Sequence, residues 1–118
     1  MRYLCLLYVD ENVLAALPAS SLRVLNAEWH DYRAQLQRSG ELIVGEVMQS
    51  VLSTTTLERQ GDRLLLRDGP RFGCCEQPAA ICLLDTHDLN DAIRLASRLP
   101  PARLGCIEVR ALGSRAPP

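Results

Sequence analysis

The sequence predicts an α+β fold in which two helices cover one face of an antiparallel sheet. Three observations support this fold class. A short apolar run opens the chain, two later stretches have helical periodicity, and segments rich in β-forming residues lie between turn signals. The predicted order is strand, helix, strand, strand pair, strand, helix and strand. This order corresponds to a ferredoxin-like βαββαβ unit with an inserted β-hairpin.

The first predicted strand has apolar side chains on both faces. Residues 3–9 form an apolar run without alternation, which is typical of a strand that is buried on both sides. Two helices can cover only one face of the sheet, and the sequence predicts no third helix for the other. Because an exposed apolar face marks an association site, we expect a homodimer in which a second copy of the chain covers it.

The remaining elements follow from apolar spacing and turn chemistry. Apolar residues at spacings of three and four predict two helices, the first capped by Ser20 or Ser21 and the second by Asp88. Threonine-rich sequence before a glycine turn predicts the inserted hairpin. The predicted ranges are a helix over 20–39, a strand over 42–48, hairpin strands over 53–59 and 63–67, a strand over 81–84, a helix between Asp88 and Pro100, and a strand over 106–112.

Length and charge restrict the function classes. The chain has 118 residues and a net charge of −1, so we expect one domain over residues 1–113, a disordered tail over 114–118 and no direct contact with nucleic acid. The longest apolar run is far shorter than the ~20 residues of a membrane helix, and the N-terminus has no signal-peptide pattern. We therefore expect a cytoplasmic protein without membrane contact.

The five cysteines do not form a metal-binding pattern. The sequence has no CxxC and no histidine-spaced pair, so it predicts no metal and no cofactor. Cys5, Cys82 and Cys106 lie in apolar runs and are expected to be buried as small hydrophobic residues. Cys74 and Cys75 lie in a predicted loop, where two incidental thiols are favoured over a redox role.

Charged residues at unusual positions are the candidate functional groups. Glu46 interrupts an apolar strand, where a desolvated carboxylate would have a raised pKa and suit acid–base chemistry. An ion pair with Arg110 or an edge position is the favoured alternative. Glu108 and Arg110 are two residues apart on the last strand, so they share a face. Asp68 precedes a Gly-Pro pair and is first a turn residue, with an acid–base role as the alternative.

Short motifs recur in order along nearly the whole chain. They are Met1–Tyr8 followed by Asp10-Glu11, Ser39–Leu42, Gly45-Glu46 with Gln49, Thr54–Thr56, Asp68-Gly69-Pro70, Glu76-Gln77, Asp88–Ala92 and Ile107–Arg110. Each motif is short, but their order and spacing together resemble those of the YCII-related, DGPF-domain family of small bacterial proteins. The biochemical activity of that family is largely unassigned.

The resemblance implies a dimeric α+β barrel built from ferredoxin-like subunits, with a pocket between the sheet and its loops. It also implies an association with an extracytoplasmic-function (ECF) sigma factor. Among acidic residues at matching positions, the candidates for a catalytic role are Asp68, Glu46 and Glu76. The candidate ligand-pocket residues are Tyr8, Glu46, Asp68, Glu108 and Arg110.

The chain departs from the family pattern directly after Pro70. Arg71 replaces the family's phenylalanine, Gly73 a glutamate and Cys75 a lysine, so the acid and the base of that loop are missing. This loss favours a dimeric small-molecule-binding or regulatory module beside a sigma factor. The alternative is a small enzyme that uses pocket carboxylates as general acid and base, and a purely structural role is a third reading. The expected partners are a second copy, an ECF sigma factor and a small-molecule ligand.

Overall fold

The structure is a computed structural model, and it describes residues 1–113. The tail predicted for 114–118 lies outside the described residues. The helices and strands are β1 (Arg2–Asp10), α1 (Glu11–Ala15), α2 (Ala19–Arg38), β2 (Leu42–Val47), β3 (Thr55–Gln60), β4 (Arg63–Asp68), β5 (Glu76–Asp85), α3 (Leu89–Ala96) and β6 (Gly105–Ala111). Two short 3₁₀ turns cover Val51–Ser53 and Pro100–Leu104.

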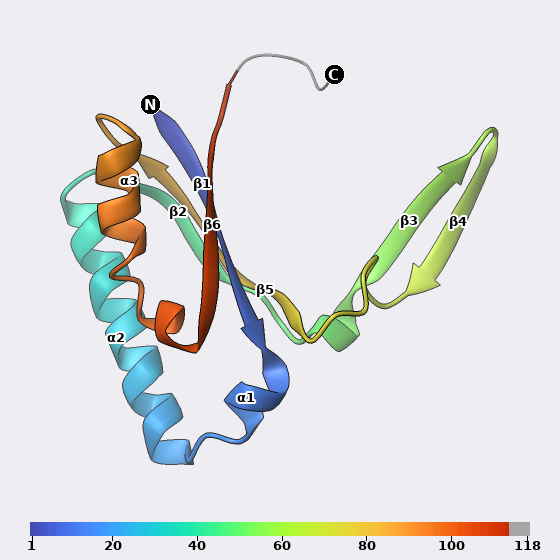
Figure 1. The fold of residues 1–118 in the computed structure, drawn as a ribbon, viewed down its shortest axis with the longest axis horizontal. Coiled ribbons are helices and arrows are strands. Elements are labelled where there is room, and N and C mark those ends of the chain that lie inside the picture. Colours follow the sequence, from blue (N-terminus) through green and yellow to red (C-terminus); the bar gives the residue numbers. More distant parts are fainter. Residues whose placement is uncertain (114–118) are drawn as a thin grey trace.

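Four strands form one antiparallel sheet in the order β2-β5-β1-β6. Helices α2 and α3 lie on the same side of this sheet (Figure 1). This order is that of a ferredoxin-like βαββαβ unit, in which β3 and β4 are inserted between the second and third strands. The predicted α+β fold class and the predicted hairpin are therefore confirmed.

The core lies between the sheet and the two long helices. Alternate residues of β1 and β5 are buried, including Cys5 opposite Cys82, and they pack against α2 and α3. Burial raises the pKa of the Cys5 thiol to about 11 and that of Cys82 to about 12, so both stay protonated and pack as small apolar groups. The expectation that Cys106 is buried as well is wrong. Its register opposite Tyr8 places it on the other face of the sheet, where it is exposed.

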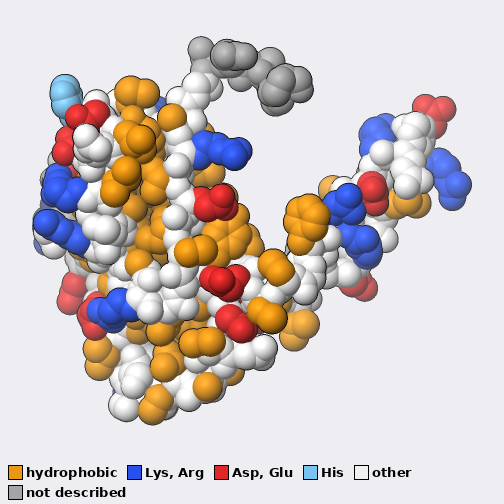
Figure 2. All heavy atoms as spheres, in the orientation of Figure 1, with side chains coloured by type: hydrophobic (Ala, Val, Ile, Leu, Met, Phe, Trp, Pro, Cys, Tyr) orange, Lys and Arg blue, Asp and Glu red, His pale blue; other side chains and the backbone are white. Residues whose placement is uncertain are grey.

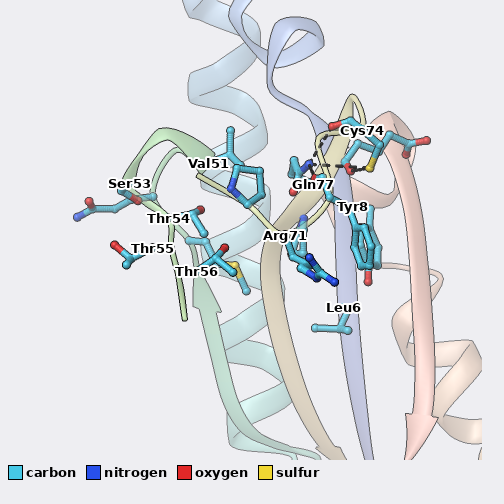
Figure 3. A pocket seen from close by; sticks show the side chains of 16 residues that line it. Leu6, Tyr8, Val51, Ser53, Thr54, Thr55, Thr56, Arg71, Cys74 and Gln77 are labelled. Carbon is cyan, nitrogen blue, oxygen red and sulfur yellow. Dashed lines mark hydrogen bonds between the residues drawn. The ribbon is translucent and has the colours of Figure 1, made fainter. Parts of the chain in front are cut away.

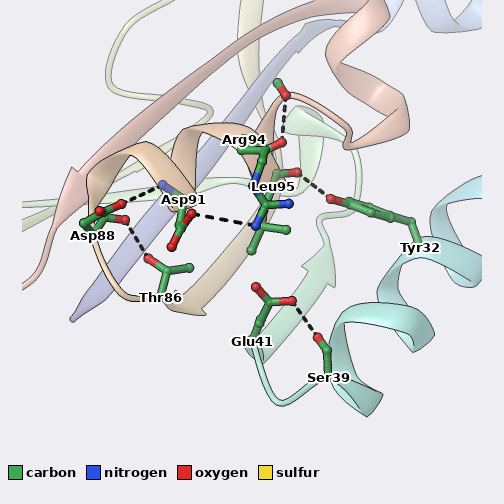
Figure 4. A network of polar contacts seen from close by, with 9 residues as sticks. Tyr32, Ser39, Glu41, Thr86, Asp88, Asp91, Arg94 and Leu95 are labelled. Atoms are coloured by element: carbon green, nitrogen blue, oxygen red, sulfur yellow. Dashed lines mark hydrogen bonds and ion pairs between the residues drawn. The ribbon is translucent and has the colours of Figure 1, made fainter.

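Helix α3 is fixed at both ends by polar contacts (Figure 4). The Asp88 side chain accepts a hydrogen bond of 2.9 Å from the Asp91 backbone N–H, which confirms the predicted cap. The Tyr32 hydroxyl of α2 donates to the Leu95 carbonyl at 2.7 Å and so joins the two helices. The cap predicted for α2 is wrong, because the helix begins one residue earlier than Ser20 and Pro18 occupies the cap position.

Strand β5 begins at Glu76 instead of residue 81, because β1 offers backbone partners as far as Asp10. The register of this pair shifts between Leu7 and Tyr8, and Pro78 lies opposite Tyr8. A proline cannot donate to the ladder and is accommodated at such an irregularity. The extension places Glu76 and Gln77 alongside the end of β1.

The β3–β4 hairpin projects from the rest of the molecule and forms a sheet of its own (Figure 1). The radius of gyration is 16.1 Å, against about 13.5 Å for a compact chain of this length. No strand residue of the hairpin is buried. Leu57, Leu64 and Leu66 share one of its faces and are each more than half exposed. A two-stranded hairpin is marginally stable alone, so this element needs a further contact.

The start of β6 has room only for glycine. A Cβ at Gly105 would lie 1.8 Å from the Tyr8 carbonyl oxygen, whereas a Cβ at Gly73 would meet nothing within 4 Å. Gly105→Ala is therefore expected to lower the free energy of unfolding by about 3 kcal/mol, because the strand must move away from β1. Urea denaturation measures the change, and Gly73→Ala is the matched control. Equal stability of the two variants would contradict the close approach of β6 to Tyr8.

Candidate functional site

The face of the sheet opposite the helices is apolar and lies open. The register places on it Leu4, Leu6 and Tyr8 of β1, Ile81 and Leu83 of β5, Val44 and Glu46 of β2, and Cys106, Glu108 and Arg110 of β6. We call these residues the open face. No helix of the described chain covers them, and Figure 2 shows hydrophobic side chains on the side of the sheet that faces the hairpin. The apolar side chains predicted on both sides of β1 are thus present, with one side in the core and the other half-buried.

A cavity of about 620 Å³ lies between the open face and the base of the hairpin (Figure 3). Its volume is within the range of pockets that bind small molecules. Leu6 and Tyr8 of the open face form one side. The rest comes from the two connections that flank the hairpin, with Met48, Gln49, Val51 and Ser53–Thr56 on one and Pro70–Phe72, Cys74 and Glu76–Pro78 on the other.

The Asp68-Gly69-Pro70 motif closes the base of the hairpin. Gly69 has a φ of +98°, a backbone conformation that glycine adopts without strain. Its N–H donates to the Thr54 carbonyl at 2.8 Å, and its own carbonyl accepts from the Thr56 hydroxyl at 2.7 Å. The motif therefore brings Pro70, Arg71 and the next residues over the cavity. These contacts are made by the backbone of the motif and not by its carboxylate, because the Asp68 carboxylate has no hydrogen bond or ion pair with any residue of 1–113.

Two further polar side chains shape the cavity. The Gln77 amide donates to the carbonyls of Phe72 and Cys74, both at 2.8 Å, and so folds the loop before β5. The Glu11 carboxylate accepts from the Ser50 hydroxyl at 2.9 Å and from the Val51 N–H, which fixes the 3₁₀ turn beside the cavity. Sequence reasoning assigned no role to Glu11, because its partners are about 40 residues away and no local pattern marks them.

Tyr8, Glu108 and Arg110 come together on the open face. With Leu4 and Leu6 they line a smaller cavity of about 210 Å³, which shares Leu6 and Tyr8 with the larger one. Hydrogen bonding with Glu108 raises the pKa of the Tyr8 phenol, followed by desolvation and the charge of Glu108. The phenol is therefore protonated at neutral pH.

Glu76 lines the large cavity and also a neighbouring one that contains Asp10, Arg103 and Cys106. Desolvation raises the pKa of the Cys106 thiol, and the charges of Glu76 and Glu108 and a hydrogen bond with Glu76 add to this effect. The Cys106 thiol is therefore held in its unreactive protonated form.

Glu46 and Asp68 lie outside both cavities that contain Tyr8. Glu46 is on the edge strand β2, two-thirds exposed, and its carboxylate is 3.7 Å from the Arg33 guanidinium of α2. The edge position weighed from the sequence is thus observed, with Arg33 in place of Arg110 as the ion-pair partner. Asp68 ends β4 and is exposed. The candidates that the structure brings to the cavities are Tyr8, Glu76, Glu108 and Arg110.

The fold and this site define a small α+β protein with a ligand-sized cavity beside an open sheet face. The chain belongs to the YCII-related domain family, whose sequence model matches residues 1–113. The resemblance to this family seen in the sequence motifs is therefore confirmed. No curated protein matches the chain. Among the described residues, no helix is long and apolar enough to span a bilayer, and no three or more His, Cys, Asp or Glu side chains are grouped as metal ligands.

The link between Tyr8 and Glu108 can be tested by titration. Replacing Glu108 with glutamine removes the negative charge that disfavours the phenolate, so the Tyr8 pKa is expected to fall toward its ordinary value of about 10. The pH-dependent NMR shifts of ¹³C-labelled tyrosine measure this midpoint for each of the three tyrosines. Glu58→Gln on the hairpin is the control and leaves the Tyr8 midpoint in place. An unchanged midpoint in Glu108→Gln would show that the two side chains do not interact.

Proposed function

We propose that this protein is a small-molecule-binding module that acts as a homodimer, with the ligand between the open face and the base of the hairpin. The observation that carries the proposal is the cavity of about 620 Å³. It has an apolar side formed by Leu6, hydroxyl groups from Thr54 to Thr56, and the Gln77 amide. A mainly apolar cavity with a few convergent polar groups is the usual form of a ligand site.

The surface area supports association with a second copy. The chain exposes 8287 Å², whereas a compact monomer of this mass exposes about 6400 Å². The difference is as large as the area that stable protein interfaces bury. Val44 of the open face and Leu57, Leu64 and Leu66, which form the leucine face of the hairpin, are among the exposed large hydrophobic residues. A second copy of the sheet between these two faces would cover both and complete a dimeric α+β barrel.

We propose more specifically that this module has a regulatory role beside an ECF sigma factor in the cytoplasm. It is supported by the family resemblance, in which such an association is frequent. The ligand would then be the signal, and the dimer would be the form that the partner protein recognises. The single-domain organisation over residues 1–113 fits such a small accessory protein.

A small enzyme is the second candidate function, and one observation favours it. Of the three carboxylates considered for acid–base chemistry, Glu76 lines the cavity, whereas Glu46 and Asp68 do not. The enzyme would therefore depend on Glu76 as its acid or base, with the protonated Tyr8 phenol nearby as a donor. A binding module needs no such group.

Native mass spectrometry of freshly purified protein tests the proposal. We expect a dimer at micromolar concentration that retains a small molecule. Leu6→Arg places a charge on the open face opposite Glu108 and is expected to give a monomer without the adduct, because burying this charge pair under a second sheet costs more than the pair gains. Val24→Arg is the matched control, since Val24 is exposed on the outer side of α2.

Two outcomes would contradict the proposal. A wild-type monomer at this concentration would exclude the dimer, and a dimer with an identical mass in every preparation and no adduct would exclude a tightly held ligand. The enzyme alternative is distinguished by the retained molecule itself. If wild-type protein converts it over time and Glu76→Gln only retains it, the protein is an enzyme.

A further inference from the structure

The chemistry of the cavity restricts the class of ligand, and this inference rests on the proposed binding function. We propose that the ligand is a small apolar monocarboxylate, held by its carboxylate on Arg71 and by its apolar body against Leu6 and Tyr8. Figure 3 shows the side chains of all three residues in the same cavity, with Arg71 between the hairpin connection and the sheet.

Among the described residues that line this cavity, Arg71 is the one cationic side chain. Within residues 1–113 its guanidinium forms no ion pair, and no hydrogen bond of its side chain is present. It lies over the Phe72 ring, with 5.6 Å between the guanidinium carbon and the ring centroid. Stacking on an aromatic ring restricts the side chain and leaves its planar edge free for a partner.

The position of Arg71 is set by the motif before it. The positive φ of Gly69 and its two hydrogen bonds to Thr54 and Thr56 fix the chain as it leaves the hairpin. Pro70 then restricts the backbone further by its ring. The guanidinium is thus presented over the cavity by a rigid turn instead of by a free loop, which lowers the entropy cost of binding an anion.

Glu76 is the only carboxylate among the described residues that line the cavity, and it forms no ion pair with Arg71. Glu76 also lines the neighbouring cavity together with Cys106, and its charge contributes to the raised pKa of the Cys106 thiol. Arg71 therefore has no ion-pair partner among residues 1–113, and a ligand with one negative charge fits it.

The rest of the lining selects the body of the ligand. Most lining side chains around Arg71 are apolar or aromatic, namely Leu6, Tyr8, Met48, Val51, Pro70, Phe72 and Pro78. A polyphosphate would need several cationic side chains, whereas the described lining has one, Arg71. A divalent metal would need several carboxylates, whereas the described lining has one, Glu76. An apolar body with a single carboxylate is the chemistry that uses both the apolar surface and the bidentate guanidinium.

Three ring compounds of similar size and different charge test this ligand class: benzoate, benzamide and benzylamine. Isothermal titration or ligand-observed NMR measures their affinities for wild-type protein, Arg71→Gln, Arg71→Lys and Arg63→Gln. Arg63 lies at the start of β4, at the far end of the hairpin from the cavity, and is the matched control. We expect benzoate to bind at least about tenfold more tightly than benzamide, with benzylamine weakest, because a charge-assisted pair adds to the same apolar contact.

The variants separate the ligand class from the binding function. Arg71→Gln is expected to remove the preference for benzoate and leave benzamide unchanged, Arg71→Lys to keep part of the preference, and Arg63→Gln to match wild type. Equal affinity for benzoate and benzamide in wild-type protein would overturn the carboxylate class and leave the binding function standing. An equal loss in Arg63→Gln would overturn the assignment to Arg71 and attribute the preference to general surface charge. Failure of all three rings to bind would overturn the apolar carboxylate class, whereas the binding function itself is tested separately by the adduct retained in native mass spectrometry.

Discussion

The sheet has two apolar faces, but the helices of the described chain cover only one of them, and the rest of the structure depends on this constraint. Strand β1 contributes to both faces. Cys5 and Leu7 are in the core, whereas Leu6 and Tyr8 lie on the open face. The hydrophobic effect scales with apolar area, so the open face remains costly in water until something covers it. The candidate functional features of the described residues lie on that uncovered side: the two cavities that contain Tyr8, the Tyr8–Glu108 pair and the projecting hairpin.

The cavity is built from chain segments that are distant in sequence, and hydrogen bonds involving both backbone and side-chain groups hold them together. Gly69 closes the base of the hairpin through its positive φ, Gln77 folds the loop before β5, and Glu11 fixes the 3₁₀ turn on the other side. The family motif Asp68-Gly69-Pro70 positions the residue that comes directly after Pro70. In this chain that residue is Arg71, so the departure from the family pattern lies at the cavity and alters its charge.

Most of the fold was predictable because its elements follow local rules. The two long helices follow apolar periodicity, the cap of α3 follows from Asp88, and the hairpin follows from its turn. The site was predictable only in part, since alternation on β6 placed Glu108 and Arg110 on one face, but no pattern showed that Tyr8 lies beside them. Glu11 could not be found because its partners are remote. The start of β5 was missed because Pro78 is typical of a loop in the sequence, and only the structure shows that a register shift in β1 accommodates it. Cys106 was misplaced because an apolar neighbourhood does not show which face of the sheet a strand residue occupies.

Hydrogen–deuterium exchange of the hairpin amides, measured over a dilution series, tests whether a second copy covers the open face and the hairpin. The hairpin has no buried residue of its own, so within one chain its amides should exchange rapidly. If a second copy covers the open face and the leucine face of the hairpin, protection of β3 and β4 appears at high protein concentration. It is then lost in step with dissociation of the dimer. Rapid exchange of these amides at every concentration would contradict the account, since the hairpin would then have no partner and the cavity no second copy beside it.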